Sequence, residues 1–220
     1  MASEIQTPDR DADGLTSESK ERIIQLVTDL FFRFGVKSIT MDDVAKHLSI
    51  SKKTLYKHFA DKNELLLKCC NYDLDKRKAA FDEISQKATD AVEELMLMMS
   101  HMEMMLGSMN PNLLFDIRKY YPQAWQSYVS FKEEHMFGCV VDNLERGIAT
   151  GLYREDIQVK VLARLRLEEV EMGFNPDLFP NGKLHVKDVQ IALFDHFMHG
   201  ITTIKGQKLI LKYKLNHLNP

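Results

Sequence analysis

The segment KKTLYKH, residues 52–58, concentrates side chains that bind nucleic acids. Lysine can reach guanine O6 and N7 or a phosphate, while threonine and tyrosine can donate hydrogen bonds to phosphate oxygens. No carboxylate interrupts this stretch before Asp61. A charged face on a short helix is often only solvated, so its chemistry depends on the elements that position it.

Capping residues predict how this segment is held. Thr40 followed by Asp43 has the form of a capping box, which predicts a helix over residues 41–48. Ser51 can cap a second helix over residues 52–59. Two short helices joined by a three-residue turn result.

A third capping signal follows the second helix. Asp61 with Glu64 repeats the capping-box pattern and predicts a longer helix that starts at Lys62. Leu55 and Phe59, four residues apart, would point inward from the second helix. This frame is a helix-turn-helix, and it favours a DNA-binding role for the basic face over simple solvation.

The segment ITMDDVAKHLSISKKTLYKHFADKNELL resembles the DNA-binding motif of the TetR family of bacterial transcription regulators. The preceding SKERIIQLVTDLFFRFGVKSIT is similar to the family's first helix, with Gly35 as a left-handed cap. The resemblance covers about residues 19–67. One departure is Ser49, where relatives usually carry glycine; serine costs little there if its φ is negative.

The motif and its side-chain chemistry give a set of candidate DNA contacts. We expect the residues that enter the major groove to be Lys52, Lys53, Thr54 and Lys57. We expect the residues that hold phosphates to be Lys37, Thr40, Ser51, Tyr56, His58 and Lys62.

The distribution of charge agrees with a DNA-binding head. Residues 20–68 contain ten Lys/Arg and six Asp/Glu, whereas the 220-residue chain has a formal net charge of −3. A basic head on an acidic body orients a protein at DNA. The sequence has no run of about 18 apolar residues and no signal-peptide pattern, so we expect a cytoplasmic protein.

Catalysis and metal binding have little support in the sequence. Asp195 and His199 have a spacing of four, but two ligands are too few for a metal site. No Ser/His/Asp order or glycine-rich phosphate loop is present. Reduced thiols are expected for Cys69, Cys70 and Cys139, with a redox switch at the first two as the rarer alternative. We expect no metal and no cofactor, and an enzyme is the weakest reading.

The apolar spacing along the rest of the chain predicts an all-α protein. After the motif, the expected helices cover residues 64–84, 91–109, 112–120, 122–148, 158–172 and 185–213. We expect a disordered tail over residues 1–15, a helix-turn-helix DNA-binding domain over 16–67, and a ligand-binding and dimerisation domain over 68–220.

Methionines crowd one predicted helix of the second domain. Four of them follow the spacing of a buried stripe: Met98, Met102, Met105 and Met109. Such a stripe could line a cavity for an apolar effector or simply fill an irregular core, and periodicity does not separate the two. TetR-family bodies commonly enclose an effector pocket, so the resemblance favours a cavity. On the following helix, further candidate wall residues are Trp125, Tyr128 and His135.

The last two predicted helices carry more apolar residues than one buried stripe requires. In proteins that this chain resembles, these helices pair with those of a second subunit as a four-helix bundle. The candidate interface residues are Val161, Leu165, Phe194, Phe197, Gly200 and Ile201. A homodimer would place two recognition helices in successive major grooves of a palindromic operator.

The function expected from the sequence is a homodimeric repressor that a small molecule releases from its operator. The effector would shift the population toward a helix spacing that no longer fits the DNA. The alternative is a DNA-binding protein whose C-terminal domain recruits a protein partner.

Overall fold

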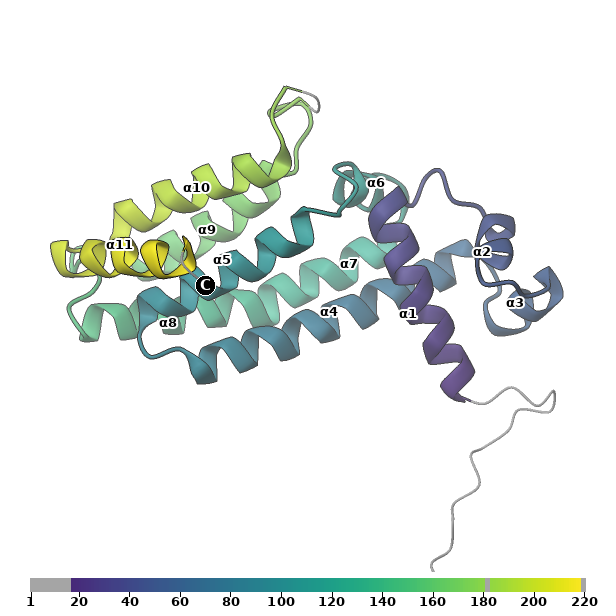
Figure 1. Ribbon diagram of the computed structural model, residues 1–220, viewed down its shortest axis with the longest axis horizontal. Helices are drawn as coiled ribbons and strands as arrows, with labels where there is room; N and C mark the ends of the chain where they lie inside the picture. Colours follow the sequence, from purple (N-terminus) through teal and green to yellow (C-terminus); the bar gives the residue numbers. More distant parts are fainter. Residues whose placement is uncertain (1–16, 181–182, 219–220) are drawn as a thin grey trace, which may run out of the picture.

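The computed structural model describes residues 17–180 and 183–218, and the fold of these residues is all-α, as predicted. The molecule is elongated, with α2 and α3 at one end, α11 at the other, and α4 running along much of its length (Figure 1). The expected tail, residues 1–15, lies outside the described residues. The helices are α1 (Ser17–Phe34), α2 (Met41–His47), α3 (Lys52–His58), α4 (Lys62–Lys87), α5 (Ala91–Leu106), α6 (Leu113–Tyr120), α7 (Pro122–Phe131), the π-helical segment η1 (Lys132–Met136), α8 (Phe137–Ala149), α9 (Val159–Gly173), α10 (Val186–Ile201) and α11 (Ile204–Leu218).

The caps predicted for the helix-turn-helix are confirmed. The amide of Asp43 donates to Thr40 Oγ1 at 3.2 Å, and the amide of Thr40 donates back to Asp43 Oδ2 at 2.9 Å. The amide of Thr54 donates to Ser51 Oγ at 3.0 Å. Asp61 caps α4 in the same way. The backbone groups at the start of each helix are thus satisfied locally, which fixes where each helix begins.

The turn between α2 and α3 is strained at Ser49. Its φ is +56°, in the left-handed region, and not negative as a low steric cost for serine would require. Its amide donates to Lys46 O at 3.1 Å, and the next amide, of Ile50, donates to Ala45 O at 3.0 Å. These two bonds hold the turn in a conformation that glycine adopts more easily.

Two hydrophobic clusters form the interior of the described chain. The first joins α1, α2, α3 and the start of α4 to α6 and α7, through residues such as Val27, Leu55 and Ile117. The second joins α5 to α8, α9, α10 and α11, around Leu144 and Phe197. Because α6 and α7 pack into the first cluster, the core of the DNA-binding end extends beyond residue 67.

The prediction of a single helix over residues 185–213 is wrong, because the chain breaks between α10 and α11. Thr202 is extended there, and the next amide, of Thr203, donates to Leu152 O at 2.9 Å. A Cβ on Gly206 would lie 2.3 Å from the same carbonyl oxygen, so glycine permits this close approach. Tertiary contacts with the loop before α9 therefore override the local helical pattern.

The helix expected over residues 122–148 is continuous but irregular. Its middle turn is the π-helical segment η1, which carries an inward-facing lysine. The buried amine of Lys132 forms ion pairs with Glu171 and, at 3.1 Å, with Glu168, both on α9. The extra residue of a π turn therefore coincides with a polar anchor between two helices.

Candidate DNA interface and effector cavity

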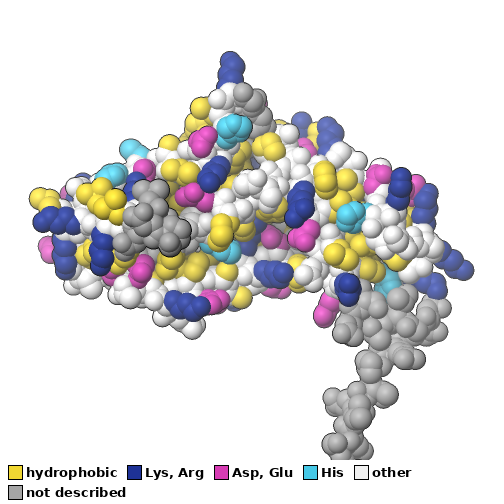
Figure 2. Space-filling model, viewed as in Figure 1, with side chains coloured by type: hydrophobic (Ala, Val, Ile, Leu, Met, Phe, Trp, Pro, Cys, Tyr) yellow, Lys and Arg dark blue, Asp and Glu magenta, His cyan; other side chains and the backbone are white. Residues whose placement is uncertain are grey.

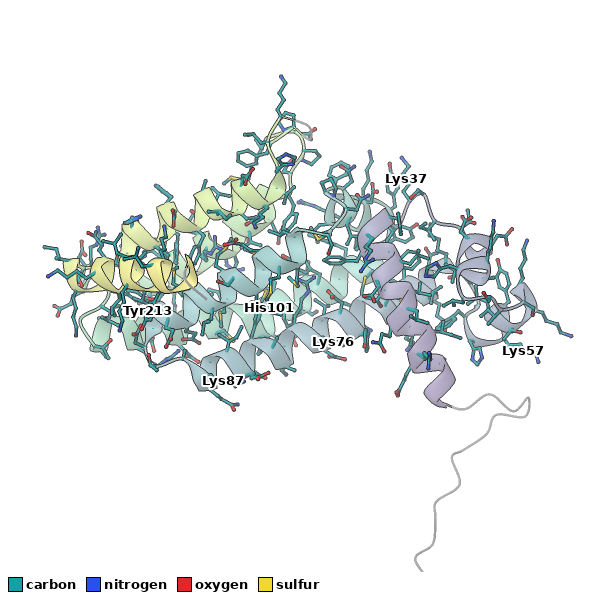
Figure 3. All side chains as sticks on the ribbon, in the orientation of Figure 1. Lys37, Lys57, Lys76, Lys87, His101 and Tyr213 are labelled. Carbon is teal, nitrogen blue, oxygen red and sulfur yellow. The ribbon has the colours of Figure 1, made fainter. Side chains whose placement is uncertain are left out.

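The outward face of α3 carries the candidate groove residues. Leu55 and the following Phe59 are fully buried and fix the helix to the body. Lys53 is exposed and Tyr56 is 49% exposed. Lys57 also lies on this face, at the tip of the molecule (Figure 3). A short helix anchored on one side and basic on the other can enter a groove.

Lys52 is not freely available on this face. Its amine forms an ion pair with Asp42 on α2, and both side chains are more than half exposed. An exposed ion pair contributes little to stability. The pair instead neutralises one positive charge at the start of α3.

Three candidate hydroxyls take part in helix capping. Thr54 Oγ1 lies 2.8 Å from Ser51 Oγ, the cap of α3, and Thr40 Oγ1 lies 2.6 Å from Asp43 Oδ2. These groups sit at helix starts, where backbone amides and the helix dipole attract anions.

Two further candidate lysines contact tyrosines at the junction of α6 and α7. Lys37 Nζ lies 5.2 Å from the ring centre of Tyr120, and Lys62 Nζ lies 5.8 Å from that of Tyr121. Lys62 also donates a hydrogen bond to the carbonyl oxygen of Val36. Cations over aromatic faces are held in position by the ring quadrupole. Figure 3 shows Lys37 beside the end of α1.

His58 differs from the other candidates, because its Nε2 is buried with no hydrogen-bond partner among the described residues. Its ring lies 6.2 Å from that of Phe59, centre to centre. This inward placement argues against the predicted phosphate contact. Lysine side chains at the same end remain at the surface, where dark blue atoms gather over α2 and α3 (Figure 2).

A cavity of about 210 Å³ lies between the helices of the body and reaches α1. The predicted methionine stripe lines it, because Met98, Met102, Met105 and Met109 all contribute to its wall. Tyr128 lines the cavity as predicted, together with residues of the DNA-binding end: Thr28, Phe31, Phe32 and Leu66. The stripe thus faces a cavity that the two ends of the molecule share.

The other two predicted wall residues lie elsewhere. Trp125 lines a separate pocket with Arg118 and Glu171. His135 lines neither described pocket, and its Nε2 lies 3.7 Å from Asp82 Oδ1 and 3.8 Å from Cys139 Sγ. The sequence places all three aromatic residues on one helix, but the π turn of η1 separates His135 from the others.

The cavity wall also holds groups that the sequence analysis did not select. Asp73 and Arg77 lie on α4, and Arg166 lies on α9. Cys69 and Cys70 also line it, and burial raises the pKa of each thiol to about 12. These thiols therefore stay protonated at neutral pH, which gives a redox switch no support.

The candidate interface residues divide into two groups. Val161 and Leu165 are 58% and 46% exposed on α9, and Gly200 of α10 has open space around it. The prediction that Phe194, Phe197 and Ile201 form a subunit interface is wrong, because all three are buried in the core of their own chain. Sequence periodicity could not tell which of two apolar faces each helix turns inward.

No group of three or more His, Cys, Asp and Glu side chains in the described residues could hold a metal ion. Asp195, considered with His199 from the sequence, pairs with Lys214 at 2.7 Å. No helix among residues 17–180 and 183–218 is long and apolar enough to cross a bilayer.

A capped helix-turn-helix at one end of an all-α chain is the architecture of a DNA-binding transcriptional regulator. The family model described as bacterial regulatory proteins, tetR family, matches residues 23–69. The matched segment contains the helix-turn-helix, and the family that it matches consists of transcriptional regulators.

Individual relatives agree with this assignment. The HTH-type transcriptional repressor KstR2 of Mycolicibacterium smegmatis is 23% identical over 207 residues, covering 90% of this chain and 98% of the relative. A TetR-family regulator from Agrobacterium tumefaciens has a similar fold, with a TM-score of 0.69, 19% identity, and coverage of 84% and 99%. So has a transcriptional regulator from Saccharomonospora viridis in complex with choline, with a TM-score of 0.66, 18% identity, and coverage of 86% and 100%.

Proposed function

We propose that this regulator is a homodimeric repressor, acting in the cytoplasm, that a small molecule releases from a palindromic operator. The observation that carries the proposal is the shared cavity wall. Phe31 and Phe32 of α1, the helix that packs against the helix-turn-helix, line the same cavity as the methionines of α5. A molecule bound there would contact both ends of the protein and could shift their relative arrangement.

In this proposal the chain divides near residue 67. Residues 16–67 bind DNA, and residues 68–220 bind the effector and the second subunit. The repressor name of the mycobacterial relative supports repression over activation.

The α3 helix would enter the major groove, where the exposed side chain of Lys53 would contact the edge of a base. Lys52, Thr54 and Lys57 would join it there. Thr40 and Ser51, at helix starts, would contact phosphates. Lys37 and Lys62, which lie against tyrosine rings, and Tyr56 would provide the other phosphate contacts. We omit His58, because its unpaired nitrogen is buried.

The dimer would form through α9 and α10. Val161, Leu165 and Met172 are exposed along one face of α9 at helical spacing. On α10, exposed Gly200 would allow a partner helix to approach closely. Two such faces would pack as a four-helix bundle and set the distance between the two recognition helices.

The effector would occupy the cavity lined by the methionine stripe, whose flexible thioethers adapt to a ligand's shape. The choline in the Saccharomonospora viridis regulator is a small molecule held by a protein of the same fold. It supports an effector site here without identifying the effector.

Selection of bound duplexes from a random library, at a stated salt concentration, tests the DNA-binding proposal. We expect a palindromic site whose affinity falls steeply as salt rises. Enrichment of a single, non-palindromic half-site would contradict the dimeric mode. Recruitment of a protein partner, the alternative role of the body, would require that no apolar small molecule changes the affinity for the selected duplex.

A further inference from the structure

The effector cavity is long and narrow. Its α4 wall runs from Leu66 to Phe81, which spans about 22 Å at 1.5 Å per residue. The volume of about 210 Å³ is small for such a length. A shape of this kind fits an extended hydrocarbon better than a compact ring system, and the methionine walls can adjust to its width.

Two polar donors line this largely apolar cavity. Arg77 Nε donates to Asp73 Oδ2 at 2.6 Å, which fixes the guanidinium one turn along α4. Neither terminal nitrogen of Arg77 donates a hydrogen bond to a described residue. A guanidinium always carries its proton, so these four N–H groups remain available as donors.

Tyr128 of α7 adds a second donor to the cavity lining. Its hydroxyl makes no hydrogen bond with a described residue, and it lines the cavity together with Arg77. Burial raises the pKa of Tyr128, so its hydroxyl keeps its proton and can donate. The nearby carboxylate of Glu171 also raises the pKa of Tyr128, whereas the charge of Arg77 lowers it, which agrees with Arg77 being close to the hydroxyl.

The second cation at the cavity, Arg166, is covered by other side chains of the protein. Arg166 lies 3.6 Å from Glu169 and stacks over the rings of Phe194 and Phe197. This guanidinium is therefore held on both sides within the protein. Its Nη1 makes no hydrogen bond with a described residue, as is true of the terminal nitrogens of Arg77, but the two phenylalanine rings cover the Arg166 guanidinium.

We propose that the cavity binds an elongated apolar monocarboxylate, with its carboxylate on the terminal nitrogens of Arg77 and the hydroxyl of Tyr128. This inference rests on the proposed function of the cavity as the effector site. The planar guanidinium fork matches the two oxygens of a carboxylate, and charge-assisted hydrogen bonds of this kind are stronger than those between neutral groups. Asp73 is a positioning residue, because it orients Arg77 through Nε and leaves the fork open.

Calorimetric titration of the full-length protein tests the ligand class. The probes are decanoate, decanol and decyltrimethylammonium, which share one alkyl chain and differ in head group, each below its micelle concentration. We expect decanoate to bind at least about tenfold more tightly than the other two.

Variants then test the residues. Arg77→Gln should abolish the preference for decanoate, and Tyr128→Phe should reduce it. Lys76→Gln is the matched control, because it removes the same charge from an exposed neighbouring position of α4 that does not line the cavity (Figure 3). If Arg77→Gln fails to fold, the double variant Asp73→Asn/Arg77→Gln removes both charges together and should show the same loss. Equal binding of decanol, tighter binding of the ammonium, no binding of any probe, or an unchanged preference in the Arg77 variants would each overturn the proposal.

Release of the selected duplex, measured separately, distinguishes this inference from the proposed function. If decanoate binds through Arg77 but leaves the DNA complex intact, the ligand class stands and the effector role fails. If another class of compound releases the DNA while carboxylates do not bind, the effector role stands and the ligand class fails.

Discussion

The backbone amide of Asn110 donates a hydrogen bond to the carbonyl oxygen of Phe32, with an N···O distance of 2.8 Å. Asn110 lies between α5 and α6, both of which line the cavity, whereas Phe32 belongs to α1. The Asn110 side chain also packs against Gly35, the residue at which α1 ends. This contact connects the cavity to the end of α1, two residues before Lys37.

Replacement of Gly35 by alanine should destabilise the protein at this contact. Gly35 has a φ of +81°, and a Cβ there would lie 3.1 Å from Cγ of Asn110. The left-handed conformation and the tight contact together should lower the free energy of unfolding by at least about 1 kcal/mol. Urea denaturation followed by circular dichroism measures this.

Gly138→Ala is the matched control for that substitution. Gly138 lies in α8 and is exposed, and a Cβ there would meet no atom within 4 Å. The same chemical change should therefore raise stability by about 0.5–1 kcal/mol, through a lower backbone entropy of the unfolded chain. A loss of stability in this variant, or none in Gly35→Ala, would contradict the structural account of these two glycines.

Ser49→Gly should stabilise the protein by about 0.5–1 kcal/mol, because glycine adopts a positive φ without the steric cost that serine bears. Ser51→Ala, two residues on, should instead cost about 1 kcal/mol, because it removes the cap of α3. Thermal unfolding of both variants, compared with the parent, gives opposite shifts in melting temperature if the turn is built as described. Two shifts of the same sign would reject it.

The helices of the DNA-binding end were predictable because local capping residues determine where each helix begins. Thr40, Ser51 and Asp61 each satisfy amides within three residues, so sequence spacing alone locates the start of α2, α3 and α4. The sign of φ at Ser49 was not predictable, because the bonds of the turn and not the residue type impose it.

In the body, periodicity predicted the helices but not what each face packs against. The methionine stripe could have filled a core or lined a cavity, and only the tertiary arrangement places it on a cavity wall. Phe194 and Phe197 were expected at an interface for the same reason, and they lie in the core. The break at Thr202 depends on a contact with Leu152, fifty residues away in the sequence. A local sequence pattern cannot predict such a contact.

Asp42→Asn should strengthen DNA binding without regard to sequence. It releases the amine of Lys52 from its ion pair and removes a negative charge beside the proposed phosphate contacts. We expect higher affinity for specific and random duplexes alike, and a slope of log K against log salt steeper by about one.

Lys53→Gln should instead change the preferred base at one position, by about 1–3 kcal/mol. Fluorescence anisotropy titrations at several salt concentrations measure both, and equal weakening of all duplexes by Lys53→Gln would reject its base contact.

Leu165→Glu should convert the proposed dimer into monomers. Leu165 is 46% exposed in the single chain, at the middle of the apolar face of α9, and a glutamate there would bury an unpaired charge in a helix–helix interface. Leu211→Glu is the control, because Leu211 is 60% exposed on α11, outside the proposed interface. Sedimentation velocity should show monomers for the first variant and dimers for the second, with the circular dichroism of both unchanged. A dimer that persists in Leu165→Glu would move the interface away from α9, and dissociation by Leu211→Glu would place it on α11.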